Sequence, residues 1–280
     1  MKNIFDTLSH DISKMTTKKY STSFSLGISL LNQDIQKAIY AIYGFVRFAD
    51  EIVDSFHEFD KETLLSDFKN QTFLAISQGI SLNPILNSFQ WVVKKYNIPD
   101  DLIHTFLNSM EMDLYQKKYD QSKYEQYILG SAEVVGLMCL KIFVQNNEDL
   151  YQKLKESAMK LGSAFQKINF LRDLKSDFFE LGRTYFPGIN FDDYQNLKDA
   201  KKEIELDIEK DFLMAYKGIK MLPKNVRFGV YMAYTYYMKL FEKIRNTDIE
   251  IILNQRIRIP NNKKYSLFVF SYLRHNFNLL

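Results

Sequence analysis

The sequence has few of the residues that cross-link, bend or interrupt a chain. Cys139 is the only cysteine among 280 residues, which excludes an internal disulfide and any metal site built from several cysteines. It lies in an apolar run, so we expect a packed thiol, and this cysteine usage fits a reducing, intracellular compartment. The 10 glycines and 5 prolines are few for this length, and they disfavour all-β and glycine-rich architectures.

Several signals of partner and location are also missing. Segments without a charged residue, such as Phe228–Met238, fall short of the roughly 20 residues of a membrane-spanning helix. The first fifteen residues have no uninterrupted apolar core, so they do not predict a secretory signal. The net charge of +3 is too small to indicate a nucleic-acid partner, although it would not repel an anionic substrate. We therefore expect a cytoplasmic protein that touches a membrane from one side at most.

Apolar and aromatic residues are abundant, and their spacing is helical. Hydrophobic residues make up 46% of the chain and include 23 Phe and 18 Tyr, which predicts a wide apolar interior. No alternating strand pattern, internal repeat or linker divides the chain, so we expect one all-α domain over residues 1–280 with about ten helices. The expected helices cover residues 3–15, a short segment within 19–31, 40–54, 62–77, 84–96, 99–118, 124–144, 148–180, 199–221, 226–245 and an amphipathic tail at 265–280.

The segment Tyr40–Asp54, YAIYGFVRFADEIVD, combines an apolar helix with charged side chains. At 3.6 residues per turn, its residues Tyr43, Arg47, Asp50 and Asp54 lie along one stripe. Burying unpaired carboxylates is unfavourable, so this stripe should face a wet cavity, a cation or other charges.

A second stripe follows in Phe165–Arg183. Gln166, Asn169, Asp173 and Asp177 share one helical face, and the last three offer oxygen ligands of the kind that Mg²⁺ prefers. A solvated helix face is the simpler interpretation of such acids, but the flanking residues are apolar and leave little other polar surface. If the two stripes face each other across a cavity, they could hold several Mg²⁺ ions and bind a diphosphate between them. An aromatic pocket beyond would house a hydrocarbon chain and stabilise a carbocation.

These residues resemble the squalene/phytoene synthase family of head-to-head prenyl transferases, over about Lys18 to Arg258. DEIVD (Asp50–Asp54) is similar to the family's first aspartate-rich motif, and NFLRDLKSD (Asn169–Asp177) is similar to the second. GRTYFP (Gly182–Pro187) and YSTSF (Tyr20–Phe24) resemble two further family segments.

The resemblance implies an isoprenoid-synthase helical bundle around a central cavity, and a two-step reaction. One prenyl diphosphate ionises and is attacked by a second, and the resulting cyclopropylcarbinyl diphosphate ionises again and rearranges to a 1-1′ linked product. The implied metal ligands for Mg²⁺, or alternatively Mn²⁺, are Asp50, Asp54, Asn169, Asp173 and Asp177. The implied catalytic residues are Asp50, Asp54, Asp173, Asp177, Tyr43 and Arg47, and the implied substrate contacts are Ser21, Ser23, Phe24, Tyr127, Gln166, Arg172, Arg183, Tyr185, Tyr237 and Arg256.

Within the family, we expect condensation of two geranylgeranyl diphosphates to phytoene, an ending that loses a proton and needs no NADPH. Squalene or dehydrosqualene formation from farnesyl diphosphate is the alternative, because the sequence does not set the chain length. A non-catalytic helical assembly factor would be expected to lose metal ligands, and all five are present. A head-to-tail prenyl transferase or terpene cyclase would not explain YSTSF and GRTYFP.

Four further features are not assigned a role in the reaction. Glu133 replaces a small residue that many family members have, so the cavity wall at this point is uncertain. His10, His57, His104 and His275 have no ligand spacing, and we expect none of them to be catalytic. The tyrosine-rich run 231–237 is expected in the core and cavity wall. The amphipathic tail either packs as a last helix, which we favour, or rests on a membrane.

Overall fold

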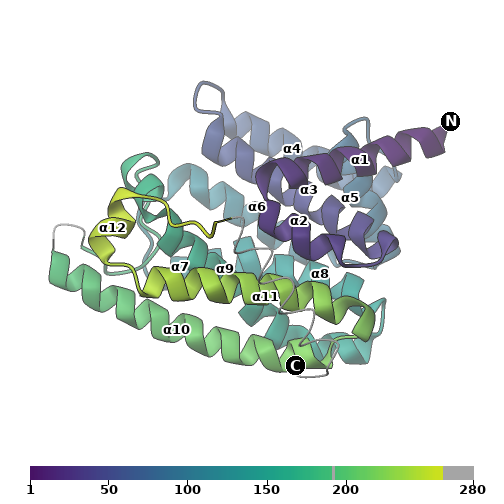
Figure 1. Ribbon diagram of the computed structural model, residues 1–280. Coiled ribbons are helices and arrows are strands. Elements are labelled where there is room, and N and C mark those ends of the chain that lie inside the picture. Colours follow the sequence, from purple (N-terminus) through teal and green to yellow (C-terminus); the bar gives the residue numbers. More distant parts are fainter. Residues whose placement is uncertain (191–192, 261–280) are drawn as a thin grey trace.

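The computed structural model describes residues 1–190 and 193–260, and these form α-helices joined by short connections (Figure 1). The elements are α1 (Lys2–Tyr20), α2 (Thr22–Ser29), α3 (Gln33–Ser55), α4 (Lys61–Gln78), α5 (Pro84–Lys95), α6 (Asp100–Tyr115), α7 (Gln121–Ile128), the π-helical turn η1 (Leu129–Glu133), α8 (Val134–Val144), α9 (Glu148–Phe179), α10 (Tyr194–Met221), α11 (Lys224–Arg245) and α12 (Ile249–Asn254). No strand occurs in the described part of the chain, so the expected all-α fold class is confirmed.

Helix boundaries follow local capping more closely than apolar periodicity. The predicted start at residue 199 was wrong, because the side chain of Asp193 accepts a hydrogen bond from the backbone N–H of Asn196 and caps α10 five residues earlier. The predicted helix through residue 118 ends at Tyr115, because Lys118 instead forms an isolated β-bridge with Thr184. The short helix α12 was not predicted, and the predicted tail helix at 265–280 lies outside the described residues.

The apolar segment predicted at 124–144 is not one regular helix. It contains α7, the π-turn η1 and α8 in succession. A π-turn adds a residue to one helical turn and is frequent at functional sites. Here the carbonyl oxygen of Ala132 in η1 lies so close to α9 that a Cβ on Gly162 would be 2.5 Å from it.

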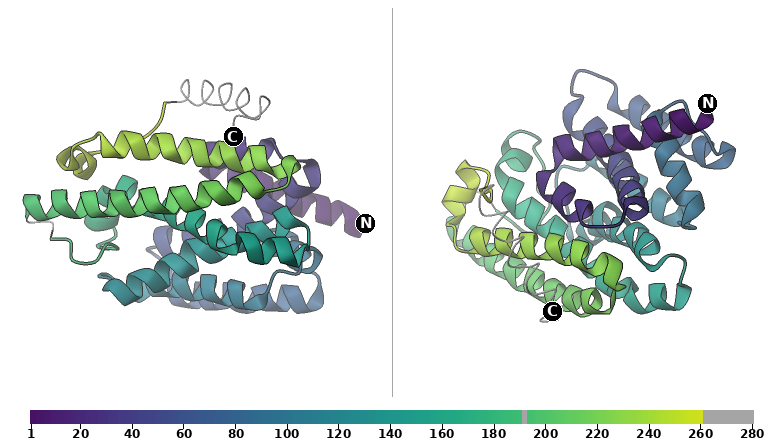
Figure 2. Two further views of the ribbon diagram at one scale, coloured as in Figure 1. Left: turned by 90° about the horizontal axis from the view of Figure 1, so that it is seen from below. Right: turned by 45° about the vertical axis from the view of Figure 1, so that its right-hand side comes forward.

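α9 is the helix that organises the fold. It packs against α8 and η1 on one side and against α10, α11 and α12 on the other. α10 and α11 run side by side along one face of the molecule, while α1, α3, α4 and α5 lie together on the opposite side (Figures 1 and 2). Phe24 and Tyr234 contact both of the large buried apolar clusters, and they join these two halves of the core.

One helical stretch is long and apolar enough to be compared with a membrane-spanning helix. Among the described residues, Gln121–Val144 has the length and hydropathy of such a span, and 61% of its most apolar window is buried inside the protein. A buried core helix has the same length and composition, and this stretch packs against α6 and α9.

Candidate active site

A cavity of about 620 Å³ runs along α3 and α9. On α3 its lining changes from Ile39 at one end to Asp54 at the other, a distance of about 22 Å along the helix axis. On α9 it changes in the same way, from Leu154 to Asp177. The cavity therefore has an apolar inner part and a charged mouth.

The charged stripe of α3 lies at this mouth. Tyr43, Arg47, Asp50 and Asp54 all line the cavity, as the helical spacing predicted. The Arg47 guanidinium donates hydrogen bonds to Asp50 and Glu51. Its Nε atom is buried and has no hydrogen-bond partner among the described residues, so one donor of this arginine is left unused inside the site.

The charged stripe of α9 forms the other side of the mouth. Gln166, Asn169, Asp173 and Asp177 line the same cavity as the stripe of α3. Two arginines converge on Asp173: Arg172 donates from Nε at 2.9 Å, and Arg256 lies 2.7 Å from Oδ1. Cations and carboxylates therefore alternate around the opening.

Two carboxylates at the mouth have raised pKa values. Burial, followed by the charge of Asp54, raises the pKa of Asp50 to about 7, although Arg47 acts in the opposite direction. Burial, followed by the charges of Asp173 and Asp54, raises the pKa of Asp177 to about 8. Because Asp54 on α3 affects Asp177 on α9, the two stripes share one electrostatic environment.

Arg183, which was predicted to contact substrate, does not line the cavity. Its side chain is only 6% exposed and pairs with Asp54 of the mouth. It donates to Asp54 Oδ1 at 2.6 Å, to the carbonyl oxygen of Val53 at 3.2 Å and to that of Asp113 at 2.9 Å. These bonds point to a different role, which is to hold the end of α3 and its carboxylate Asp54 in place.

Asp113 on α6 is the residue that the sequence analysis missed. Its buried carboxylate accepts hydrogen bonds from the hydroxyls of Tyr127 at 2.6 Å, Tyr119 at 3.1 Å and Tyr185 at 3.1 Å. Burial raises its pKa to about 6, although Arg183 acts in the opposite direction. The sequence offered no clear signal, because Asp113 follows Glu111 by two positions and has no acid three or four positions away to mark a shared helical face.

The predicted aromatic residues form part of the wall. The rings of Phe165 and Tyr237 stack at 3.9 Å, and Phe24 contacts Tyr237 at 5.6 Å. Tyr127 and Tyr185 also line the cavity, with ring centroids 5.0 Å apart. Of the tyrosines in the run 231–237, Tyr237 lines the cavity, and Tyr231 and Tyr234 pack in the core.

Ser21, at the start of α2, also lines the cavity, and its hydroxyl accepts a hydrogen bond from the backbone N–H of Phe24 at 3.2 Å. The side chain of Ser23 lies outside the described residues. Tyr20 lines the mouth, with the Arg47 guanidinium 4.3 Å above its ring. Cys139 lines the apolar part, where burial raises the pKa of its thiol to about 12.

Glu133, whose surroundings were uncertain from the sequence, faces α9. Its carboxylate accepts a hydrogen bond from the hydroxyl of Ser163 at 2.7 Å, and it is not among the residues that line the cavity. The histidines show structural contacts: His10 packs edge-to-face on Trp91, and His104 stacks on Phe73.

Comparison with known proteins identifies the class of this fold. A dehydrosqualene synthase crystal structure in complex with ligand superposes with a TM-score of 0.83 at 20% identity, and the match covers 96% of this chain and 98% of that one. This similarity shows the all-α isoprenoid-synthase fold.

The family follows from the sequence match. The family model for squalene/phytoene synthase matches residues 17–263, so the chain belongs to this family of prenyl transferases. A phytoene synthase from Arthrospira platensis is 26% identical over 95% of this chain and 93% of its own length. A 15-cis-phytoene synthase from Synechocystis is 26% identical over 95% of this chain and 85% of its own length.

Proposed function

We propose that the protein is a phytoene synthase, which condenses two geranylgeranyl diphosphates head to head through a cyclopropylcarbinyl diphosphate. The observation that carries this proposal is the placement of two carboxylate stripes at the mouth of one deep, aromatic-walled cavity. The two phytoene synthases similar to nearly the whole chain support the C20 substrate.

The oxygen donors at the mouth fit a hard divalent cation. They are carboxylate and amide groups, and burial, followed by the charges of neighbouring carboxylates, raises the pKa of Asp50 and Asp177. In the described part of the chain, no three His, Cys, Asp or Glu side chains gather as a ready metal site. Mg²⁺ is commonly shared between one or two carboxylates and the phosphates of a substrate, and the two carboxylate stripes supply such ligands.

Asp50, Asp54, Asn169, Asp173 and Asp177 would hold this Mg²⁺, or Mn²⁺ in its place. When bound, the metal neutralises the diphosphate that leaves. The protein's own contribution is to orient these oxygens from two rigid helices. Arg183 keeps Asp54 in position at the end of α3.

Other residues at the mouth would bind the two diphosphates. Arg47 has a buried Nε donor without a partner, which is suited to a phosphate oxygen. The remaining proposed contacts with diphosphate are Ser21, Ser23, Gln166, Arg172 and Arg256.

The inner wall would hold the hydrocarbon chains and exclude water from the cations. Aromatic faces stabilise a nearby positive charge, and Phe24, Tyr43, Tyr127, Tyr185 and Tyr237 supply them. The final cation loses a proton to give the last double bond, so we expect no requirement for NADPH.

The test is to incubate the purified full-length protein with Mg²⁺ and either geranylgeranyl or farnesyl diphosphate, without NADPH, and to identify the products. We expect phytoene from the C20 substrate and no product after chelation of the metal. Squalene or dehydrosqualene as the main product would reassign the chain within its family. No product from either substrate would leave a non-catalytic helical protein.

A further inference from the structure

The first helix, α1, turns its apolar side chains outward. Ile4 is 73% exposed, Leu8 51% and Met15 57%. At positions 4, 8 and 15 these side chains share one face of the helix, over about 16 Å of its length. Isolated exposed apolar residues are common, but a row of them on one helix indicates a contact surface.

The opposite face of α1 is buried and polar. Ser9, Ser13, Thr16 and Thr17 face the protein interior. The Ser13 hydroxyl is 2.6 Å from that of Ser88 on α5, and the hydroxyls of Ser9 and Thr17 donate to the carbonyl oxygens of Phe5 and Ser13. A surface helix of a globular protein normally has the reverse arrangement, with its apolar face inside.

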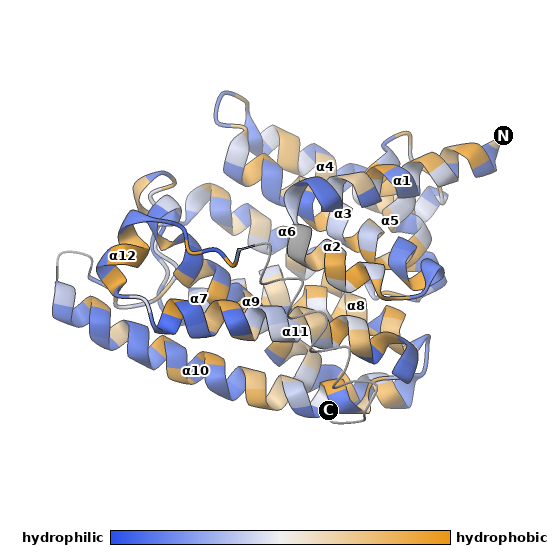
Figure 3. Cartoon of the chain, in the orientation of Figure 1, coloured by the Kyte–Doolittle hydropathy of each residue, from blue (hydrophilic) through white to orange (hydrophobic). Residues whose placement is uncertain are grey.

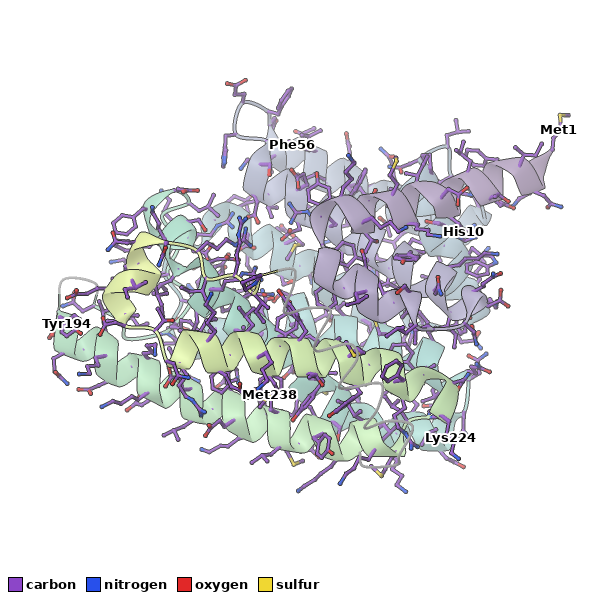
Figure 4. The ribbon with its side chains drawn as sticks, viewed as in Figure 1. Met1, His10, Phe56, Tyr194, Lys224 and Met238 are labelled. Carbon is purple, nitrogen blue, oxygen red and sulfur yellow. The ribbon has the colours of Figure 1, made fainter. Side chains whose placement is uncertain are left out.

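This inversion shows that the fold does not use the outward apolar residues. Small hydroxyl side chains let α1 approach α3 closely, since a Cβ on Gly44 would lie 3.2 Å from the Ser13 hydroxyl. Figure 3 shows apolar segments along α1 between hydrophilic ones, and Figure 4 shows Met1 at the far tip of the helix, away from the helical body.

Charge at one end of the same face indicates which partner fits. Lys14, Lys18 and Lys19 are exposed, and none of them forms an ion pair with a described residue. Of the acids of α1, Asp6 lies away from this face and pairs with Lys2 at 2.8 Å, whereas Asp11 is exposed on the face itself, between Leu8 and Met15. The three lysines outnumber this one acid. A row of apolar side chains beside unpaired lysines is the pattern of a helix that lies in the interface of an anionic bilayer.

The surface continues into the cavity mouth. α1 ends at Tyr20, and both Tyr20 and the following Ser21 line the cavity. A bilayer held against α1 would therefore lie beside the opening through which an apolar chain enters or leaves.

We propose that the outer face of α1, formed by Ile4, Leu8, Met15, Lys14, Lys18 and Lys19, docks on an anionic lipid bilayer next to the cavity mouth. This surface does not include the segment 265–280, and docking by it does not depend on the proposed reaction. Its test needs no prenyl substrate, so it can fail or succeed independently of the phytoene synthase proposal.

The experiment is flotation of the purified full-length protein with vesicles of phosphatidylcholine that contain phosphatidylglycerol, and with vesicles of phosphatidylcholine alone. Each lysine near an anionic surface should contribute about a fivefold gain in binding, so the triple variant K14Q/K18Q/K19Q should bind on the order of 100-fold more weakly. The triple variant I4S/L8S/M15S should lose about tenfold for each side chain that enters the lipid. Raising the salt from about 0.1 M to 1 M, which shortens the Debye length from about 10 Å to 3 Å, should weaken wild-type binding.

A matched control is available on the other side of the molecule. Leu206 and Leu213 on α10 are 59% and 66% exposed, and Lys210 lies between them on the exposed side. The variant L206S/K210Q/L213S should bind vesicles like the wild type, and all variants should keep the wild-type melting temperature because the changed residues are exposed.

Three outcomes would overturn the proposal. In the first, the wild type does not float with anionic vesicles. In the second, the α1 variants float as well as the wild type, which would place lipid binding elsewhere, such as in the tail. In the third outcome, I4S/L8S/M15S converts a dimer to a monomer in sedimentation and leaves vesicle binding unchanged, which would make this face an interface between two copies.

Discussion

Replacing the buried Arg183 with methionine should destabilise the protein much more than the same replacement of an exposed arginine at the site. Arg183 is 6% exposed and lies among three carboxylates, because it donates to Asp54 Oδ1, lies 3.9 Å from Asp113 Oδ1 and affects the pKa of Asp177. Removing one partner from a buried ion pair costs roughly 3–5 kcal/mol, because the remaining charge stays buried without compensation. At about 2–4 °C per kcal/mol, this corresponds to a fall in melting temperature of about 10 °C.

Arg256→Met is the matched control. Arg256 also pairs with a site carboxylate, Asp173, but its side chain is 51% exposed. Exposed pairs contribute about 0–1 kcal/mol, so this variant should melt within a few degrees of the wild type. Both variants should lose activity, but only the Arg183 variant should lose much stability.

A double variant identifies the cause of the instability. In the Arg183→Met background, Asp113→Asn removes one uncompensated buried charge, so the double variant should be more stable than Arg183→Met alone. The same uncompensated charge predicts a pH dependence. The pKa of Asp113 is already raised to about 6, and without Arg183 it should rise further. The native state of the Arg183→Met variant then binds more protons than the unfolded state, so its loss of stability relative to the wild type should shrink as the pH falls from about 8 to 5.

Thermal and urea unfolding of these four proteins, followed by circular dichroism, provide the measurement. Equal melting temperatures for Arg183→Met and Arg256→Met would refute the reasoning, because burial would then not distinguish the two pairs. A double variant less stable than Arg183→Met would show that lost hydrogen bonds, and not an uncompensated charge, cause the instability.

Three further predictions concern the carboxylates and the packing of α9. Asp50→Ala or Asp173→Ala should lower the rate of product formation by about 100- to 1,000-fold. Glu58→Ala, on the exposed α3–α4 connection, should not lower it. A normal rate in either site variant would show that the replaced residue has no role in the reaction. Because the pKa values of Asp50 and Asp177 are raised to about 7 and 8, the native state binds more protons than the unfolded state, so the free energy of unfolding should fall as the pH rises from about 4 to 8. Asp177→Asn should flatten that urea-denaturation profile, and an unchanged slope would contradict its assignment. Gly162→Ala places a Cβ 2.5 Å from the Ala132 carbonyl oxygen and should cost about 1–3 kcal/mol in urea unfolding, and a neutral result would show that α9 can move away from η1.

Side-chain spacing along single helices was readable from the sequence. Tyr43, Arg47, Asp50 and Asp54 were expected on one face, and Asn169, Asp173 and Asp177 on another, and both sets line the cavity. Such predictions succeed because the helical repeat is a local property, so residues three or four positions apart share a face whatever the rest of the chain does.

Helix ends were less predictable, because they depend on single hydrogen bonds. Asp193 caps α10 earlier than the apolar pattern indicated, and the bridge between Lys118 and Thr184 ends α6 early. The π-turn η1 also had no sequence signal that we recognised, and its residue Ala132 lies close to Gly162 on another helix.

The sequence by itself determined an all-helical chain with two acidic stripes, aromatic residues in number and no disulfide. Only the tertiary structure decided that Arg183 pairs with Asp54, that Asp113 accepts hydrogen bonds from three tyrosine hydroxyls, and that α1 has exposed apolar side chains. Arg183 and Asp54 are 129 positions apart, so no local pattern relates them. Burial and long-range pairing depend on how helices pack, and the same periodic pattern is compatible with either face of a helix being inside.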